Sequence, residues 1–448
     1  MKYKLKEIAQ MCEGKLFGNG EKLVETIFLD SRENIKNSLF VAIIGEKVDA
    51  HNFIDSVFEK GTSVLSQKKL ENPKGDYILV DDTIKALQKI ARVHRDLMNT
   101  RLVGITGSVG KTTTKEFIAL AIENQIPTLK TAGNANSQVG LPLTLLRLEK
   151  EHNCGIIEMG MSLPGEMERL SECARVNFAV VTNIGVSHIE FHNTKENIMR
   201  EKLHITDKFD ENSILFINAD DELLGKEQFS FNTISFGLSE NCNYRAVDIS
   251  ENNGETFFNC LRNGEKIKMQ ISVLGEHNIR NALVALAVAE TLGLDTKKTV
   301  QNISTYKAVD RRQEMLKTDK FTIINDSYNA SPDSMKTALD VLCKLEGRKI
   351  AIMADVLELG EYSQKGHSDV GFYAKEKNID FLLCFGNDAK YMYEAFGNEG
   401  KSAYFKDYNQ AEKFIQNFAK KGDNILVKGS RGMKTERFAE KLIKNEGA

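Results

Sequence analysis

Residues 101–117 read RLVGITGSVGKTTTKEF, an apolar strand followed by a glycine-containing loop and the start of a helix, and this stretch decides the fold. Glycines let the backbone approach phosphate groups closely, and the N–H groups and positive dipole end of the following helix point at them. Lys111 is placed to reach the β- and γ-phosphates of a nucleotide, and Thr112 to supply a hydroxyl to Mg²⁺. The strict pattern G-x-x-x-x-G-K-[ST] has glycine where this chain has Ile105, so the loop is a variant phosphate-binding loop. A chance glycine turn is the alternative, and the strand–loop–helix context argues against it.

The segments around this loop predict an α/β protein of three domains. From residue 101, apolar runs such as LVGIT, GIIEM and FAVVTN alternate with helical segments, as in a mostly parallel sheet covered by helices. After residue 310 the alternation starts again with FTIIN, KIAIMAD and NILVKG. We predict a small α/β domain over 1–98, a central P-loop-type, mostly parallel sheet domain over 99–310 and a C-terminal Rossmann-like α/β domain over 311–448.

Bulk composition argues against several classes of protein. The 448 residues include 60 basic and 63 acidic side chains, which gives a formal net charge of -3. This balance does not show the excess of positive charge that is typical of proteins that bind nucleic acid. No stretch has the length of a membrane span, and the lysine-rich N-terminus does not read as a signal sequence. Seven cysteines without a C-x-x-C pair suit a reducing compartment. We expect a cytoplasmic protein, with a monomer as the default.

Two polar side chains follow strands that should end near the phosphate loop. Glu158 ends the apolar strand GIIEM, and the carboxyl ends of parallel strands are where α/β sheets bind ligands. A carboxylate there suits Mg²⁺, although a surface carboxylate just past a strand is the alternative. His188 is the last residue of FAVVTNIGVSH, the segment that contains the next strand, and should reach the same edge, whereas a lone histidine is more often structural. Lys202, in the helical run KENIMREKLHITDKF, reads by itself as a solvent-exposed helix lysine.

Eight motifs occur together and in a recognisable order. They are GSVGKTTTKE (107–116), GNANSQVGLPLTLL (133–146), EMGM (158–161), HIE (188–190), GEHNIRNA (275–282), DSYNASPDSM (326–335), DVLELGE (355–361) and KGSRGM (428–433). With these motifs the chain resembles the Mur ligase family, cytoplasmic enzymes that build the peptide stem of bacterial peptidoglycan. The resemblance extends over nearly the whole chain.

The resemblance implies roles for the matching residues. Lys111 would bind phosphate, Thr112 and Glu158 would hold a first Mg²⁺, and His188 and Lys202 would serve a second. In the family the lysine that matches Lys202 is carbamoylated by CO₂, which turns a cation into an anionic oxygen ligand. The expected catalytic residues are therefore Lys111, Lys202, His188 and Glu158.

A larger set is expected around ATP by the same resemblance. Asn136 would lie near the phosphates and Asn278 and Asn281 near the adenine, while Arg312 and Asp326 would reach the phosphates and ribose from the third domain. The full expected ATP-binding set is Gly107, Ser108, Val109, Gly110, Lys111, Thr112, Thr113, Asn136, Asn278, Asn281, Arg312, Asp326, Tyr328 and Asn329.

The first domain resembles the part of the family that receives the UDP end of a muramyl substrate. The similarity lies in Asp30-Ser31-Arg32 and in SLFVAIIGEKVDAHNF (38–53). Without the family, D-S-R would read as an ordinary turn. The expected substrate-binding residues are Asp30, Ser31, Arg32, Phe40, Lys47 and His51.

The activity that the resemblance implies is ATP-dependent ligation of D-alanyl-D-alanine to UDP-MurNAc-tripeptide through an acyl phosphate, with two Mg²⁺ ions. The alternatives are a sister ligase that adds one amino acid, a folylpolyglutamate synthetase-like ligase, and a nucleotide-gated switch protein. DSYNASP after FTIIN favours the dipeptide-adding enzyme. Glu158, His188 and Lys202 argue against a switch, which needs no second metal site. The sequence leaves open whether the third residue of the accepted peptide is lysine or diaminopimelate.

Overall fold

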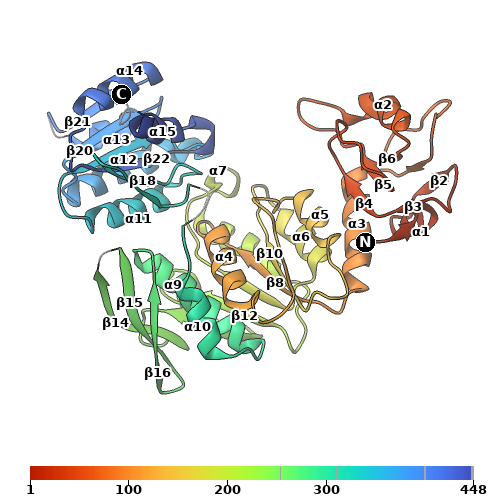
Figure 1. The fold of residues 1–448 in the computed structure, drawn as a ribbon, viewed down its shortest axis with the longest axis horizontal. Coiled ribbons are helices and arrows are strands. Elements are labelled where there is room, and N and C mark those ends of the chain that lie inside the picture. Colours follow the sequence, from red (N-terminus) through yellow and green to blue (C-terminus); the bar gives the residue numbers. More distant parts are fainter. Residues whose placement is uncertain (253, 309–310, 398–399, 445–448) are drawn as a thin grey trace.

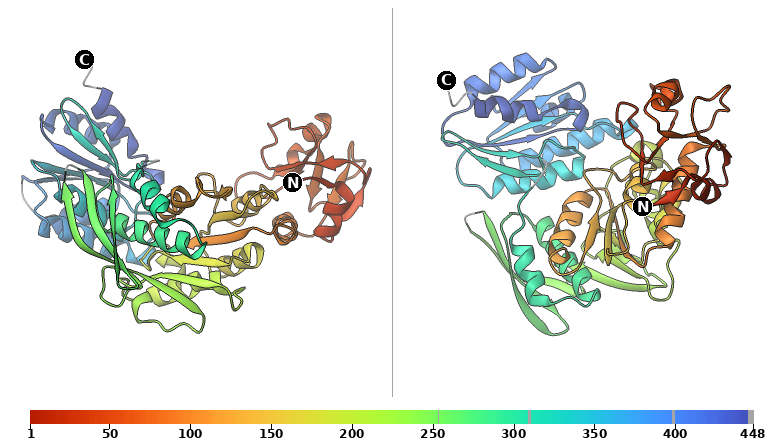
Figure 2. Two further views of the ribbon diagram at one scale, coloured as in Figure 1. Left: turned by 60° about the horizontal axis from the view of Figure 1, so that its bottom comes forward. Right: turned by 45° about the vertical axis from the view of Figure 1, so that its right-hand side comes forward.

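The computed structural model describes residues 1–252, 254–308, 311–397 and 400–444, which form three lobes, each with its own main sheet (Figure 1). The N-terminal and C-terminal lobes lie at opposite ends of the molecule, and the central lobe joins them (Figures 1 and 2). This agrees with the predicted three-domain α/β architecture. The residue bounds of the domains stay a prediction, and residue 310, at one of them, lies outside the described residues.

The N-terminal lobe contains a five-stranded sheet in the order β2-β7-β6-β5-β4, parallel except for β2. Its strands are β2 (Lys15–Phe17), β4 (Thr26–Phe28), β5 (Ser38–Val41), β6 (Ser63–Ser66) and β7 (Tyr77–Leu79). Two further strands, β1 (Tyr3–Lys4) and β3 (Leu23–Val24), pair separately. The helices are α1 (Leu5–Met11), α2 (Ile54–Glu59) and α3 (Thr83–Asp96).

The central lobe is built on nine strands in the order β16-β15-β14-β13-β12-β11-β8-β10-β9. They are β8 (Arg101–Thr106), β9 (Thr128–Lys130), β10 (Cys154–Glu158), β11 (Phe178–Val181), β12 (Ile214–Asn218), β13 (Asn232–Gly237), β14 (Tyr244–Asn252), β15 (Glu255–Arg262) and β16 (Glu265–Ile271). The helices are α4 (Lys111–Ile122), α5 (Gly140–Leu145), α6 (Glu166–Ala174), α7 (Ile189–His192), α8 (Lys195–Leu203), α9 (Glu276–Thr291) and α10 (Thr296–Ser304). Strands β8 to β14 run parallel to their neighbours, and β15 and β16 extend the sheet antiparallel.

Strand β8 is the point where the strand order reverses. It lies between β10 and β11, and the chain leaves it through α4 to reach β9 on one side and later returns to β11 on the other. Such a switch opens a crevice at the carboxyl end of the strand, where α/β sheets bind ligands. Val103 and Ile105 pack into the core under α4 and α9, while Leu102 packs into the core on the opposite face. Burial on both faces explains the near-continuous apolar run of this strand.

Helix α3 connects the first two lobes rather than belonging to one of them. Its buried residues include Leu87 and Ile90. His94 Nε2 lies 2.9 Å from the Leu148 carbonyl, and Arg95 Nε donates to the Ala174 carbonyl at the end of α6 at 2.9 Å. Helix α3 therefore packs on the central lobe as well as on the N-terminal lobe.

The C-terminal lobe carries a six-stranded sheet in the order β17-β18-β22-β19-β20-β21, parallel except for β17. The strands are β17 (Glu314–Lys317), β18 (Thr322–Asn325), β19 (Lys349–Ala354), β20 (Phe381–Phe385), β21 (Ser402–Phe405) and β22 (Asn424–Lys428). The helices are α11 (Pro332–Cys343), α12 (Ser363–Glu376), α13 (Ala389–Phe396), α14 (Tyr408–Phe418) and α15 (Glu436–Lys444). In the described parts of the chain, no helix has the length and apolar character to cross a membrane.

Candidate functional site

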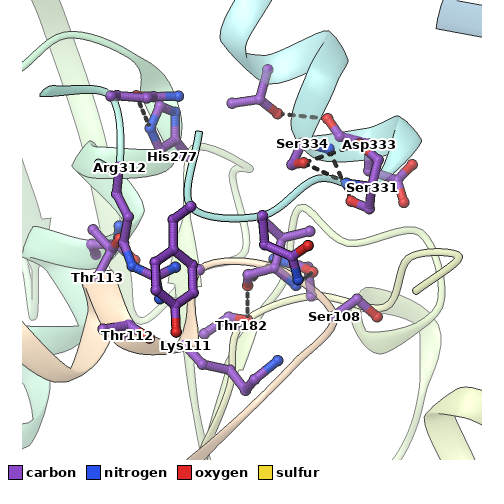
Figure 3. Close-up of a pocket in the computed structure, with 18 of the residues that line it drawn as sticks. Ser108, Lys111, Thr112, Thr113, Thr182, His277, Arg312, Ser331, Asp333 and Ser334 are labelled. Atoms are coloured by element: carbon purple, nitrogen blue, oxygen red, sulfur yellow. Dashed lines mark hydrogen bonds between the residues drawn. The ribbon is translucent and has the colours of Figure 1, made fainter. Parts of the chain in front are cut away.

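A cleft of about 1140 Å³ separates the carboxyl ends of the central strands from the C-terminal lobe. It brings together most of the residues expected around ATP and metal. Those that line it are Ser108, Val109, Gly110, Lys111, Thr112, Thr113, Asn136, Glu158, His188, Asn278, Asn281, Arg312, Asp326, Tyr328 and Asn329. Figure 3 shows Arg312 from the C-terminal lobe extending toward the start of α4, where Lys111, Thr112 and Thr113 lie.

The phosphate loop has the backbone geometry that its glycines were expected to supply. Gly107 has φ +148° and Gly110 has φ +89°, values that favour glycine. A Cβ atom on Gly107 would lie 1.9 Å from Thr182 Oγ1. The Lys111 ammonium donates to the Gly107 carbonyl at 2.7 Å, and burial lowers its pKa, with Glu158 opposing this effect and Arg312 adding to it. Lys111 is therefore folded back on its own loop beside a carboxylate and a guanidinium.

Two residues that the sequence reasoning missed hold this loop in place. Asn183 accepts from the Val109 N–H at 2.9 Å and returns its amide N–H to the Val109 carbonyl at 2.9 Å. The Thr182 hydroxyl donates to the same carbonyl at 2.6 Å (Figure 3). Both follow β11, the strand beside β8, so the signal available in the sequence was the polar pair that ends an apolar strand.

Thr112 and Glu158 form an oxygen-rich pair at the foot of the cleft. The Thr112 hydroxyl donates to Glu158 Oε2 at 2.8 Å, and the Asn136 amide donates to Oε1 at 2.7 Å. Carboxylate and hydroxyl oxygens suit Mg²⁺, which takes few protein ligands when a nucleotide supplies phosphate oxygens. The described part of the chain has no group of three or more His, Cys, Asp or Glu side chains that could hold a metal. The donor set therefore fits a cation shared with a bound nucleotide.

Lys115 is a second residue of α4 that the sequence reasoning did not single out. Its side chain is 1% exposed, and its Nζ donates to the Thr131 carbonyl at 2.8 Å and the Gly133 carbonyl at 3.3 Å. The same Nζ lies 3.9 Å from Glu158 Oε2. Lys115 thus fixes the segment that leads to Asn136 and places a positive charge behind the Glu158 carboxylate.

The reading of Lys202 as a solvent-exposed helix lysine was wrong, because α8 turns this side chain inward and leaves it 1% exposed. Its Nζ has no hydrogen bond or ion pair with any residue that the structure describes. Burial and the Lys111 charge place the pKa of Lys202 well below its ordinary value. Burial also lowers the pKa of His188 to about 3, with the charges of Lys111 and Lys202 adding to the shift. The Lys111 charge thus acts on both side chains, and His188 lines the same cleft as Lys111.

The C-terminal lobe presents cations to the cleft. The Arg312 guanidinium lies 3.8 Å from the centroid of the Tyr328 ring, and its buried Nε has no hydrogen-bond partner among the described residues. Asp326 accepts from Lys428 Nζ at 2.7 Å and from the Gln313 N–H at 3.1 Å. Asp326 is thus committed to an ion pair, whereas Arg312 retains a buried donor for a ligand.

Several direct contacts hold the C-terminal lobe against the central lobe. The Val186 N–H donates to Asp333 Oδ2 at 3.0 Å, whereas His188 Nδ1, although 2.8 Å from Glu358 Oε2, makes no hydrogen bond with any described residue. On the other side of the cleft, His277 Nε2 lies 2.9 Å from Gln313 Oε1. The cleft is therefore bounded by a docked interface between the two lobes.

Asn278 and Asn281 form one wall of the cleft from the first turns of α9. Both are buried. The Thr114 hydroxyl donates to Asn281 Oδ1 at 2.7 Å, and the Asn278 amide donates to the Leu274 carbonyl at 2.8 Å. Asn281 therefore couples α9 to the phosphate-loop helix, while Asn278 is bonded to the loop before α9. The proximity of both residues to an adenine ring stays a prediction.

The residues expected to bind the UDP end lie in the N-terminal lobe and do not line the cleft. Arg32 forms a forked pair with Asp30, with Nε–Oδ1 at 2.8 Å and Nη2–Oδ2 at 2.5 Å. Lys60 Nζ donates a hydrogen bond to the Ser31 carbonyl oxygen at 2.8 Å. This geometry is that of the ordinary turn considered above, with an exposed guanidinium.

The remaining three residues of that set differ in their surroundings. Phe40 is 0% exposed and packs against Phe28 in the lobe's core, and its part in binding a substrate stays a prediction. Both ring nitrogens of His51 are engaged, with Nδ1 2.7 Å from Asp49 Oδ1 and the Gln67 N–H donating to Nε2 at 3.2 Å. Lys47 is exposed.

Comparisons with known proteins agree with this architecture. Residues 105–289 match the Mur ligase middle domain, and residues 311–431 match the domain described as Mur ligase, glutamate ligase domain. The UDP-N-acetylmuramoyl-tripeptide--D-alanyl-D-alanine ligase of Bacillus subtilis (strain 168) is 34% identical over 456 residues, covering 99% of each chain. The Escherichia coli (strain K12) protein of the same name is 29% identical, covering 98% of each chain.

The solved structures give the same result. The crystal structure of MurF from Acinetobacter baumannii superimposes with a TM-score of 0.94 at 27% identity, covering 99% of each chain. MurF ligase from Thermotoga maritima in complex with ADP superimposes with a TM-score of 0.86 at 30% identity, covering 94% of this chain and 98% of that one. With both domain matches, these relatives and the phosphate-loop cleft in agreement, the chain belongs to the Mur ligase family.

Proposed function

We propose that this protein uses ATP to join D-alanyl-D-alanine to UDP-MurNAc-tripeptide, giving UDP-MurNAc-pentapeptide, ADP and phosphate. The names of its relatives support the substrates, and the ADP complex of the Thermotoga maritima enzyme supports the nucleotide. One observation carries the proposal. The Lys111 loop and the Thr112–Glu158 pair share one cleft with Arg312, whose Nε has no hydrogen-bond partner in the described ranges of the chain.

The chemistry follows from the low reactivity of a carboxylate toward an amine at neutral pH. The terminal carboxylate of the tripeptide attacks the γ-phosphorus of ATP, the bond to the β-phosphate oxygen breaks, and an acyl phosphate forms. The dipeptide amine, after losing a proton, attacks the acyl carbon, and phosphate leaves. Lys111 would exchange the Gly107 carbonyl for phosphate oxygens, and Arg312 would stabilise the same charge from the other lobe.

Two cation sites are part of the proposal. Thr112 and Glu158 would hold one Mg²⁺ together with ATP phosphates, and the 2.8 Å contact between their oxygens fits this role. Lys202, as a carbamate, and His188 would hold a second Mg²⁺. The carbamate is supported by the burial of the Lys202 amine, because CO₂ reacts with a neutral amine and a lowered pKa keeps the amine neutral. Bound Mg²⁺ would neutralise the charge that develops on the transferred phosphoryl group.

Each of the three domains has its own role in this proposal. The N-terminal domain (1–98) would hold the UDP end with the help of the exposed cations Arg32 and Lys47, and the central domain (99–310) would hold ATP. The C-terminal domain (311–448) would complete the site and exclude water by closing further. The protein would act as a cytoplasmic monomer in cell-wall synthesis.

Phosphate release by the purified protein tests the proposal. With ATP, Mg²⁺ and UDP-MurNAc-tripeptide present, we expect release to depend on D-alanyl-D-alanine and not on free amino acids. Lys111→Ala should abolish release while the thermal unfolding temperature stays unchanged. Lys150→Ala, an exposed lysine of the same lobe, is the matched control and should be fully active. Release that requires no dipeptide would refute the assigned acceptor and favour the sister ligase or the switch protein.

A further inference from the structure

The loop after β11, residues 182–188, contacts both the phosphate loop and the C-terminal lobe. Its Gly185 N–H donates to Ser108 Oγ in the phosphate loop at 2.8 Å. The next residue, Val186, donates its N–H to Asp333 Oδ2 of the C-terminal lobe at 3.0 Å. Two consecutive N–H groups of one loop are therefore bonded to the nucleotide side of the cleft and to the opposite lobe.

The approach of Asp333 to this loop leaves no room for a side chain on residue 185. A Cβ atom on Gly185 would lie 2.3 Å from Asp333 Oδ2 and 3.1 Å from its Cγ. The same atom would lie 3.4 Å from Ser108 Cβ, which is an ordinary contact. Gly185 does not have a left-handed φ, so its backbone conformation alone does not call for glycine. The close packing of Asp333 is what requires glycine here.

Asp333 lies in the first turn of α11, but other residues cap this helix. Ser331 Oγ accepts from the Ser334 N–H at 3.2 Å, and Ser334 Oγ accepts from the Ser331 N–H at 2.9 Å, which completes a capping box. The Asp333 carboxylate instead lines the cleft and bonds to the central lobe (Figure 3). The contact between the lobes therefore accounts for this carboxylate better than the helix cap does.

The C-terminal lobe also contacts the helix that follows the loop. Helix α7 begins directly after residue 188 and lies beside the C-terminal lobe (Figure 1). A Cβ atom on Gly360, which comes after β19, would lie 2.9 Å from Glu190 Cγ on α7. The segment from β11 to α7 is thus packed against the C-terminal lobe at two points. A shift of that lobe would change the support that the segment gives to the phosphate loop.

We propose that Asp333 is a positioning residue, which couples docking of the C-terminal lobe to the phosphate loop through the Gly185–Val186 peptide. This inference rests on the proposed binding of ATP at the Lys111 loop. With Asp333 bonded to Val186, the Gly185 N–H is held toward Ser108, and the loop keeps the shape that receives phosphates. The coupling is reciprocal, so a bound nucleotide also favours the docked lobe.

The affinity for ADP tests this coupling. It is measured by isothermal titration calorimetry with Mg²⁺ and without the other substrates. For Asp333→Ala, we expect the Kd of ADP to rise about 10-fold, because a hydrogen bond to a charged acceptor is lost between the lobes. Asp333→Asn keeps an oxygen that accepts from the Val186 N–H, so its Kd should stay within about 3-fold of the wild-type value. In phosphate-release assays, Asp333→Ala should raise the KM of ATP and leave the KM of UDP-MurNAc-tripeptide unchanged.

Gly185→Ala tests the same contact from the central lobe and leaves α11 unaltered. The added methyl group would collide with Asp333 in the docked arrangement, so the Kd of ADP should rise by about 10-fold or more. Adding Gly185→Ala to Asp333→Ala should cause little further change, because the carboxylate that the methyl group would meet is gone. Additive effects of the two substitutions would show that the two residues act separately, and would overturn the inference.

Asp369→Ala is the matched control. Asp369 belongs to α12 of the same lobe and does not line the cleft, so this variant should bind ADP like the wild type. Thermal unfolding of each variant shows that a change in affinity is not a loss of folding. Wild-type ADP affinity in folded Asp333→Ala would overturn the inference. A wild-type protein that binds no ADP would instead overturn the proposed function.

Discussion

The hydroxyl of Thr112 lies 2.8 Å from Glu158 Oε2, although 46 residues separate the two in the chain. The pair joins the first residues of α4 to the end of β10 at the foot of the cleft. The other carboxylate oxygen of Glu158, Oε1, accepts a hydrogen bond from the Asn136 amide at 2.7 Å. The carboxylate is thus oriented by two hydrogen bonds from the protein, as expected of a preorganised cation site.

Glu158→Gln should raise the Mg²⁺ concentration needed for half-maximal phosphate release by about 10-fold or more, because the amide keeps the shape and removes the negative charge. Thr112→Val should also raise the Mg²⁺ concentration needed for half-maximal phosphate release. The measurement is a Mg²⁺ titration of phosphate release at saturating ATP. Glu149→Gln, on the exposed surface of the same lobe, should leave the titration unchanged. An unaltered Mg²⁺ requirement in Glu158→Gln would contradict the assignment.

Lys202→Ala should be inactive, and small carboxylic acids should restore part of the activity if a carbamate supplies the missing oxygens. The buried Lys202 amine is the reason to expect this chemistry. Activity is measured with and without added acid, and bound ¹³CO₂ is sought by NMR of the wild-type protein. Arg200→Ala, on the exposed face of the same helix α8, serves as the control and should remain active. Full activity of Lys202→Ala without rescue would leave this lysine a purely structural role.

The buried pair of Lys428 and Asp326 should dominate the local stability of the C-terminal lobe. Its side chains are 3% and 11% exposed, and the two charged atoms are 2.7 Å apart. Lys428→Met should lower the free energy of unfolding by about 3 to 5 kcal/mol, because an unpaired carboxylate stays buried. Urea unfolding measures this change. The double variant Lys428→Met/Asp326→Asn should recover much of the loss, and no recovery would show that burial of an unpaired charge is not the cause.

Stability should fall in mild acid through His277. Burial lowers its pKa to about 4 from an ordinary 6.5, so the unfolded chain takes up a proton at a higher pH than the folded protein does. The contribution of His277 to stability is therefore complete above about pH 6.5 and is lost as the pH falls toward 4. His277→Gln can still donate to Gln313 and does not titrate, so its urea midpoint should fall less steeply over this range. Identical slopes for both proteins would contradict the assignment.

The sequence by itself determined the fold class, the phosphate loop and the position of Glu158. These are local properties, because a strand, a glycine turn and a helix are specified by residues that are close in the chain, and β10 ends at the residue where its apolar run ends. The sequence also allowed His188 to be placed near the loop, since neighbouring parallel strands end at one edge of the sheet.

Only the tertiary structure decided the environment of individual side chains. Lys202 reads as an ordinary helix lysine until the packing of α8 buries it. The support of the loop by Asn183 depends on contacts between segments far apart in the chain. Burial and pairing are properties of such long-range contacts, and local sequence patterns do not specify them.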